Sequence, residues 1–322
     1  MPIAVDAMGG DKAPSEIVAG VRLATALGIA VTLVGPADLE GRGDIPLILA
    51  SEVIEMDDDP AQGVRRKKDS TLVRAAEAVR DGAASAMISA GNTGATMASA
   101  LLRMGRIKGV SRPAIATAIP VPGALPTVLL DSGANSEVQP DWLVQFAQMG
   151  SVYANYRFGI ANPRVGLLSI GEEPGKGDTL RKEAFPLLQH TPGINFIGNV
   201  EGRDIMTDSV DVVVTDGFTG NVVLKTLEGA LKTVVKALFE AFGSDPSYQL
   251  HAEALMPALL PLYETLDPDT YGGAVLLGVE GVCIISHGST SAKAMLNAIK
   301  VAEEMVSGGL VDKIRAAIAT NA

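Results

Sequence analysis

Short apolar runs rich in Val, Ile and Leu alternate along the chain with longer segments whose apolar residues recur every three or four positions. The first pattern is typical of buried strands, and the second of amphipathic helices. The pattern predicts strands over residues 2–6, 30–34, 45–49, 86–89, 114–119, 127–131, 164–169, 195–198, 210–215 and 281–285. It predicts helices over residues 15–27, 71–81, 96–104, 140–155, 176–188, 221–242 and 291–307. This alternation indicates a doubly wound α/β fold, with three αβα layers around a mainly parallel sheet.

We expect one large domain over residues 1–322, because no repeat or linker interrupts the alternation. One insertion departs from it: residues 221–266 have the pattern of two consecutive helices, broken at residues 243–246. We expect them to form a helical hairpin that projects from the sheet. Such a hairpin either packs on its own domain, makes a dimer contact or docks on a membrane surface. Docking on lipid favours a polar face rich in Lys and Arg, and here only Lys225, Lys232 and Lys236 supply one.

Composition narrows the possible functions. The 322 residues are 47% hydrophobic, which is enough to bury a large aliphatic core. The formal net charge of -11 argues against nucleic-acid binding, which needs a broad basic surface. A single cysteine, Cys283, excludes an intramolecular disulfide and fits a reducing compartment. We expect a cytoplasmic protein, because no basic signal-peptide start is present and the longest uncharged run, residues 113–130, holds four prolines.

Glycine- and amide-bearing turns follow four predicted strands, at residues 89–96, 131–135, 216–221 and 287–289. In doubly wound sheets, ligands bind beyond the carboxyl ends of the strands, and glycine lets the backbone approach them closely. We therefore expect the four turns to share one phosphate or oxyanion site. Its expected ligands are Gly91, Asn92, Thr93, Gly94, Asp131, Gly133, Asn135, Asp216, Gly217, Gly220, Gly288 and Ser289.

The sequence lacks the residues that several other kinds of site require. Residues 171–177, GEEPGKG, have too few positions between the glycines for a phosphate loop, and no dinucleotide fingerprint follows the first strand. The three histidines and the lone cysteine do not suggest a transition-metal site. Aspartates near strand ends, such as Asp6 and Asp11, could bind magnesium, but capping explains most such residues. We expect no cofactor and no metal.

Nine short motifs occur along the chain in one order: IAVDAMGGD at 3–11, VRRKKDS at 64–70, SAGNTGA at 89–95, RPAI at 112–115, LDSGAN at 130–135, NVEGRD at 199–204, DGFTGN at 216–221, YGGA at 271–274 and HGS at 287–289. With this set the chain resembles the bacterial acyl-carrier-protein:phosphate acyltransferases of phospholipid synthesis, often called PlsX. The resemblance implies transfer of a long acyl chain from acyl carrier protein to inorganic phosphate, giving acyl phosphate for a downstream glycerol-3-phosphate acyltransferase. It also implies a fold similar to the isopropylmalate and isocitrate dehydrogenases, a homodimer and loose attachment to the inner membrane face.

The implied reaction needs no side-chain nucleophile, because phosphate itself attacks the thioester. The site must instead hold a phosphate dianion and stabilise the thioester oxyanion, which preformed donors and a cation can do. We expect Lys182 to be the cation, with Lys176 second, because both flank the start of the predicted helix 176–188. Asn221 and His287 complete the expected catalytic set. Asn221 would donate a hydrogen bond, and His287 would orient phosphate, protonate the thiolate or only cap its turn.

The basic run Arg65, Arg66, Lys67 and Lys68 stands out in an acidic chain. Acyl carrier proteins are strongly acidic, so an acidic enzyme needs a local basic patch to attract one. We expect this run to dock acyl carrier protein, although charge runs are often only solvated faces.

Three other functions remain open. The implied fold also suits a hydroxyacid dehydrogenase, but no aspartate–metal cluster or adenine pocket is evident, and fold does not establish function. A non-catalytic scaffold at the membrane would use the hairpin. A phosphotransacetylase would use coenzyme A thioesters in place of acyl carrier protein.

Overall fold

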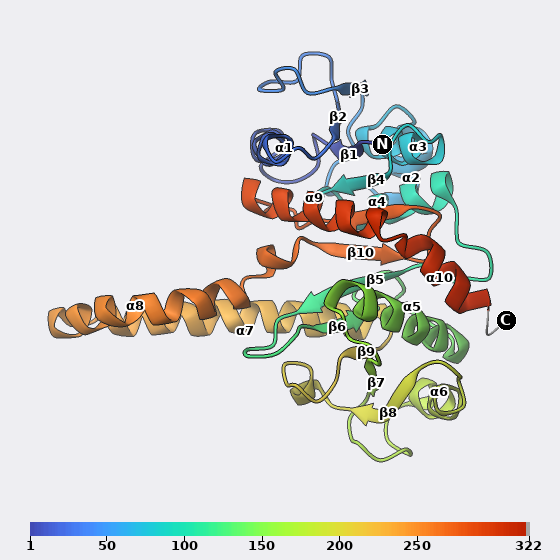
Figure 1. Cartoon of the computed structure of the whole chain (residues 1–322), viewed down its shortest axis with the longest axis vertical. Helices are drawn as coiled ribbons and strands as arrows, with labels where there is room; N and C mark the ends of the chain where they lie inside the picture. The colour runs from blue at the N-terminus through green and yellow to red at the C-terminus, as the bar shows by residue number, and fades with distance from the viewer. Residues whose placement is uncertain (320–322) are drawn as a thin grey trace.

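The computed structural model describes residues 1–319; the last three residues of the expected domain lie outside them. In the described chain, eleven strands form one sheet in the order β3-β2-β1-β4-β11-β10-β5-β6-β9-β7-β8 (Figure 1). The strands are β1 (Ile3–Asp6), β2 (Val31–Gly35), β3 (Leu47–Leu49), β4 (Ala86–Ser89), β5 (Ala114–Ile119), β6 (Thr127–Leu130), β7 (Arg164–Leu168), β8 (Asn195–Val200), β9 (Val212–Val214), β10 (Ala274–Leu277) and β11 (Val282–Ile285).

The sheet reverses direction near its centre. Strand β10 is antiparallel to both β11 and β5, and β5 is antiparallel to β6. The strands from β3 to β11 are parallel to one another, and so are the strands from β6 to β8. Two parallel halves therefore run in opposite directions and meet at β10 and β5.

Helices cover both faces of the sheet. They are α1 (Ser15–Ala26), α2 (Pro60–Arg66), α3 (Thr71–Arg80), α4 (Thr93–Ser99), α5 (Pro140–Phe158), α6 (Thr179–Gln189), α7 (Gly217–Gly243), α8 (Pro246–Leu266), α9 (Ala292–Ser307) and α10 (Leu310–Ala319), with short turns η1 (Ala100–Met104), η2 (Gly202–Asp204) and η3 (Pro268–Tyr271). A row of α1, α9, α10, α5 and α6 packs on one face, where Ile3 and Val5 of β1 point. Helices α3, α4 and α7 pack on the other face, toward which Ala4 points. The expected three-layer α/β fold with a mainly parallel sheet is confirmed.

Four local expectations were wrong or incomplete. Strand β10 was missed, because its four residues lie between glycines and are too few to show a period. Helices α2 and α10 were missed, because α2 is seven residues long and contains a glycine, and α10 follows Gly308 and Gly309 directly. The helix expected at 96–104 begins at Thr93 and becomes a π-helix at Ala100.

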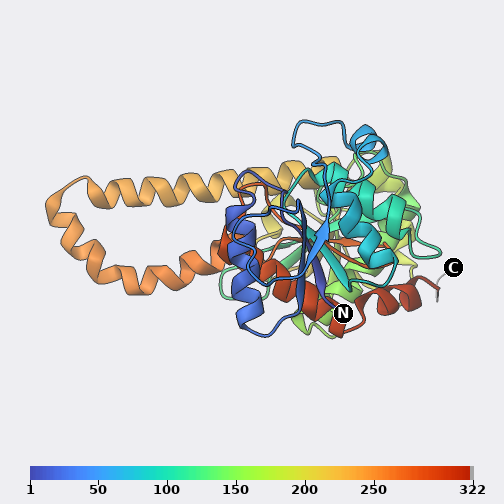
Figure 2. The same cartoon turned by 90° about the horizontal axis from the view of Figure 1, so that it is seen from above.

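Helices α7 and α8 form the expected hairpin, which extends well beyond the sheet (Figures 1 and 2). Its first part is anchored: Val223, Leu224 and Leu227 pack against a buried cluster that includes Ile119 and Leu129. Beyond that point most of its side chains are exposed. Within residues 1–319, no helix is both long enough and apolar enough to span a bilayer.

Candidate active site

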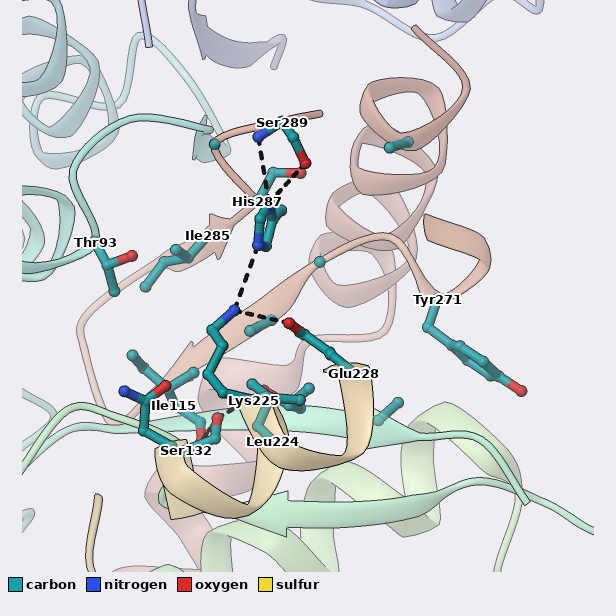
Figure 3. A pocket seen from close by; sticks show the side chains of 18 of the residues that line it. Thr93, Ile115, Ser132, Leu224, Lys225, Glu228, Tyr271, Ile285, His287 and Ser289 are labelled. Atoms are coloured by element: carbon teal, nitrogen blue, oxygen red, sulfur yellow. Dashed lines mark hydrogen bonds and ion pairs between the residues drawn. The ribbon is translucent and has the colours of Figure 1, made fainter. Parts of the chain in front are cut away.

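A cavity of about 490 Å³ lies where the two halves of the sheet meet. This volume is in the usual range for small-molecule sites. Its lining comes from the turns after β4 and β11, from strand β5, from Ser132 after β6, and from α7 between Asn221 and Lys232. Figure 3 shows Lys225 and Glu228 of α7 pointing toward His287, with Ser289 behind the ring.

The four glycine turns were expected beyond the carboxyl ends of strands that run the same way. In the structure they follow strands that run in opposite directions. Strands β4 and β11 belong to one half of the sheet, and β6 and β9 belong to the half that runs the other way. The turns still meet, because the chain after β6 folds back beside β5. There the Ser132 hydroxyl lies 2.6 Å from the Thr117 hydroxyl and donates to Ile115 O. The reversal of the sheet, rather than a common edge, therefore creates the site.

Two glycines let the start of α7 approach the turn after β6. A Cβ atom on Gly220 would lie 1.9 Å from Asp131 O, and one on Gly217 would lie 2.8 Å from Asn135 N. Any side chain at either position would push the helix away. Asp216 caps the same helix by accepting a hydrogen bond from Thr219 N at 2.8 Å. These contacts fix the start of α7, and with it the positions of Asn221 and Lys225.

Arg181 of α6 forms an ion pair with Asp216, the residue that caps this helix. The sequence pointed to the lysines near Arg181 and not to Arg181 itself. Its side chain is almost fully buried, and Nη2 lies 2.5 Å from Asp216 Oδ2 and 2.9 Å from Thr215 Oγ1. Although burial alone raises the pKa of Asp216, hydrogen bonds from Thr219 N–H and Arg181 hold this pKa below its usual value. The carboxylate is therefore ionised and tied to two helices.

Lys225 and His287 form the polar end of the cavity. Lys225 Nζ lies 2.9 Å from Glu228 Oε2 and 3.3 Å from His287 Nε2 (Figure 3). On the other side of the ring, Ser289 N donates to Nδ1 at 3.2 Å. Because Nδ1 accepts that bond, a neutral ring carries its proton on Nε2. An ammonium group and an imidazole N–H then converge on one point, which favours an anion there.

The structure places six of the expected site residues at this cavity: Gly91, Thr93, Asn221, His287, Gly288 and Ser289. Within residues 1–319, the side chains of Thr93 and Asn221 make no hydrogen bond, so both are available to a ligand. Lys225 was expected only as part of the polar face of the hairpin. Its position one helical turn after Asn221 was the signal that could have linked it to the site.

The other expected ligands build the turns instead of lining the cavity. Asn92 caps α4 through Ala95 N and donates to the carbonyls of Met56 and Asp58. Asp131 accepts from the backbone N–H groups of residues 115, 133, 134 and 135, and from the Asn135 amide. Burial raises the pKa of Asp131, although these bonds oppose the rise. Gly94, Gly133, Gly217 and Gly220 lie in the same turns and outside the lining.

Neither Lys176 nor Lys182 lines the cavity. Lys176 belongs to the loop before α6, and Lys182 lies in the first turn of that helix, next to the buried Arg181. Their catalytic roles stay predictions. The lysines that line the cavity are Lys225 and Lys232, and of these Lys225 is the one that contacts His287.

The basic run lies at the end of α2. Lys67 is engaged within the protein, 2.5 Å from Asp58 Oδ2 and 2.8 Å from Val53 O. Arg65, Arg66 and Lys68 are exposed. The loop before α2 contributes Met56 to the cavity, so the run is one short helix away from it.

Cys283 lies in the middle of the sheet and is fully buried. Burial raises the pKa of its thiol to about 12, which is the reverse of what a nucleophilic cysteine needs. Within the described chain, no three His, Cys, Asp or Glu side chains are grouped as metal ligands.

Comparison with known proteins agrees with the fold and identifies the family. A sequence model described as "Fatty acid synthesis protein" matches residues 1–313. A phosphate acyltransferase of Desulfitobacterium hafniense (strain Y51) is 50% identical over 326 residues, covering 98% of this chain and 96% of the relative. A phosphate acyltransferase of Pelotomaculum thermopropionicum is 50% identical over 328 residues, covering 99% and 95%.

Among solved structures, a branched-chain phosphotransacylase from Enterococcus faecalis V583 superposes with a TM-score of 0.61 at 13% identity, covering 95% of this chain and 99% of that one. At this identity the likeness concerns the fold alone. The sequence relatives also establish the class of protein. Because phosphate acyltransferases are 50% identical over nearly the whole chain, this protein is an enzyme of the acyltransferase class. It belongs to the phosphate acyltransferase family of fatty acid and phospholipid synthesis, as its motifs suggested.

Proposed function

We propose that this enzyme transfers a long-chain fatty acyl group from acyl carrier protein to inorganic phosphate, giving an acyl phosphate. The observation that carries the proposal is the pair Lys225 and His287, two donors 3.3 Å apart at one end of a cavity that Leu227 and Leu231 line further along α7. Two convergent donors suit a phosphate, and the apolar lining suits the acyl group that it attacks.

The reaction balances with phosphate as the nucleophile. A phosphate oxygen attacks the thioester carbonyl carbon, the tetrahedral intermediate forms, and the C–S bond breaks. The proton of the hydrogen phosphate ends on the departing thiolate, so no other reagent is needed. Lys225 holds the phosphate charge against the carbonyl, and Glu228 fixes the ammonium group at 2.9 Å. The Nε2–H of His287 can donate a hydrogen bond to the departing sulfur while the thiolate takes the proton of the hydrogen phosphate.

The oxyanion of the intermediate needs its own donors. Thr93 and Asn221, whose side chains make no hydrogen bond within residues 1–319, line the same cavity from two different helices. Donors that are held in place before the reaction stabilise the transition state without reorganisation. The acyl phosphate would then pass to a glycerol-3-phosphate acyltransferase downstream.

Acyl carrier protein would approach over the end of α2, where Arg65, Arg66 and Lys68 are exposed. Its acidic surface complements this patch, and its prosthetic arm would enter beside Met56. A homodimer and loose contact of the hairpin with the inner membrane face are further parts of the proposal. They call for a measurement of mass in solution and a vesicle-flotation assay.

The test is a phosphate-dependent assay of thiol release from palmitoyl acyl carrier protein. Lys225→Met should lower kcat/KM by ~100-fold or more, the usual effect of losing one oxyanion or anion donor. Lys182→Met is the matched variant, because it removes the same charge from a residue outside the cavity. Thiol release that ignores phosphate would refute the proposal. A larger loss in Lys182→Met than in Lys225→Met would assign the cation to Lys182.

Coenzyme A is the alternative acyl carrier. Palmitoyl coenzyme A lacks the acidic protein surface, so replacing Arg65 and Arg66 by Glu should raise KM for the carrier-protein substrate alone. An equal rise in KM for both thioesters would show that Arg65 and Arg66 do not dock acyl carrier protein.

A further inference from the structure

The cavity changes its chemistry along α7. At one end the cavity presents the polar groups of Lys225, His287 and Ser289. Further along the helix, Leu227 and Leu231 line it, together with Ile119 and Pro120 at the end of β5, while Glu228 and Lys232 line it from the neighbouring positions of α7. One continuous cavity therefore joins a polar site to an apolar one.

The apolar part is a fixed wall. Leu224, Leu227 and Leu231 are spaced three and four residues apart, so they lie on one face of α7. Leu224 and Leu227 also pack against the buried cluster that contains Ile119. Their remaining surface faces the cavity, and contact of that surface with water is unfavourable. An apolar ligand of some length would remove it from water.

We propose that this wall binds the acyl chain of the substrate: the thioester lies beside the phosphate held at Lys225 and His287, and the alkyl chain runs along α7 past Leu227 toward Leu231. The inference rests on the proposed function and assigns the part of the site that recognises the chain. Its occupant follows from continuity: under the proposed reaction, the group that reaches the leucines while its head stays near Lys225 is an acyl thioester, or the acyl phosphate formed from it, with an alkyl tail.

Helix geometry sets the scale of the channel. Leu231 lies six residues after Lys225, which is ~9 Å along the axis at 1.5 Å per residue. An extended alkyl chain advances ~1.3 Å per carbon, since its C–C bonds are near 1.5 Å. About seven carbons therefore reach Leu231. Longer chains must continue toward the half-buried Val235 of α7 and Met256 and Leu259 of α8.

The test compares two chain lengths in the phosphate-dependent assay. Leu231→Trp fills the channel at about the seventh carbon, so it should block palmitoyl chains and admit hexanoyl chains. Each methylene removed from burial is worth ~4-fold. The ratio of kcat/KM for palmitoyl over hexanoyl acyl carrier protein should therefore fall at least tenfold.

Thr233→Trp is the matched control. It places the same indole two residues away, on the opposite side of the helix, where the exposed Thr233 bonds only to Gly229 O of α7. This variant should keep the palmitoyl-to-hexanoyl ratio within about twofold of wild type. An unchanged ratio in Leu231→Trp, or an equal change in both variants, would overturn the assignment.

A binding measurement separates this inference from the proposed function. Fluorescence of parinaric acid, an 18-carbon fatty acid, reports occupation of an alkyl channel without turnover. We expect Leu231→Trp to weaken its binding at least tenfold and Thr233→Trp to leave it unchanged. Absence of thiol release in wild type would refute the proposed function. The parinaric acid measurement would then test the alkyl channel alone, and equal binding by wild type and both variants would refute the channel.

Discussion

Replacing Arg181 by Met tests whether a buried ion pair positions helix α7. The guanidinium is 8% exposed and contacts Asp216 Oδ2 at 2.5 Å, Thr215 Oγ1 at 2.9 Å and Leu168 O at 3.2 Å. Met keeps much of the volume but leaves Asp216, which is 6% exposed, without its cation. Breaking a buried pair from one side typically costs 3–5 kcal/mol.

We expect the loss in Arg181→Met to fall near the lower end of that range, at about 3 kcal/mol in the free energy of unfolding. The reason is that Asp216 keeps two other donors, Thr219 N–H and the Thr219 hydroxyl. Activity should also fall, because Asp216 caps the helix that carries Asn221 and Lys225. Unfolding in guanidinium chloride gives the first quantity, and thiol release gives the second.

Two variants make the result interpretable. Arg203→Met removes an arginine whose ion pairs, with Glu172 and Glu201, lie at the surface, and it should change stability little. The double variant Arg181→Met with Asp216→Asn removes both charges and keeps a capping side chain. It should therefore be more stable than Arg181→Met alone. A loss under ~1 kcal/mol in Arg181→Met, or no recovery in the double variant, would refute the positioning role.

Three further predictions follow from the same helix and its sheet. Gly220→Ala should destabilise the protein by ~3 kcal/mol, because the new Cβ would lie 1.9 Å from Asp131 O. Gly229→Ala, on the exposed part of α7, should stabilise the protein by ~0.5 kcal/mol. Thermal unfolding of the two variants and of wild type measures both effects. Cys283, whose thiol pKa is about 12, should resist Ellman's reagent at pH 8 in the folded protein and react on unfolding. Rapid labelling of the native thiol would contradict its burial. The pKa of Asp216 is lowered in the folded state, so its contribution to stability is present above the unfolded pKa of ~3.9 and is lost as pH falls through the folded value. Acid titrations of Asp216→Asn should lack that component, and a titration identical to wild type would disprove it.

The fold could be predicted because its signals are local. Alternating apolar runs and helical periods identified most elements, and the break at residues 243–246 identified the hairpin. Strand β10 could not be found in this way, since its four residues lie between glycines and are too few to show a period. The reversal of the sheet was missed as well, because the pairing that produces it, β5 antiparallel to β6, cannot be read from the apolar pattern of either strand. The location of the site depends on that reversal.

Lys225 is not evident as a candidate cation from the sequence, because its neighbours in space are distant along the chain. Lys182 was favoured because it follows a strand and starts a helix, which is a local argument. The contact between Lys225 and His287 joins residues 62 positions apart and exists only because α7 crosses the junction of the two halves. Helical spacing from Asn221 could have raised Lys225 as a candidate, but it could not have brought His287 to it.

Hydrogen-bond accounting separates the expected turn residues into two kinds. A carboxylate offers about four acceptor positions, and Asp131 already accepts five hydrogen bonds within its turn. It has no capacity left for a ligand, and its charge would repel phosphate. Asn221 and Thr93 are polar, line the cavity and have no internal partner in the described chain. The glycine-turn motifs therefore contain residues that shape a turn, such as Asp131, and residues whose side chains are free for a ligand, such as Asn221 and Thr93. Which residue does which depends on the partners that the fold brings to each, and the motif alone does not contain that information.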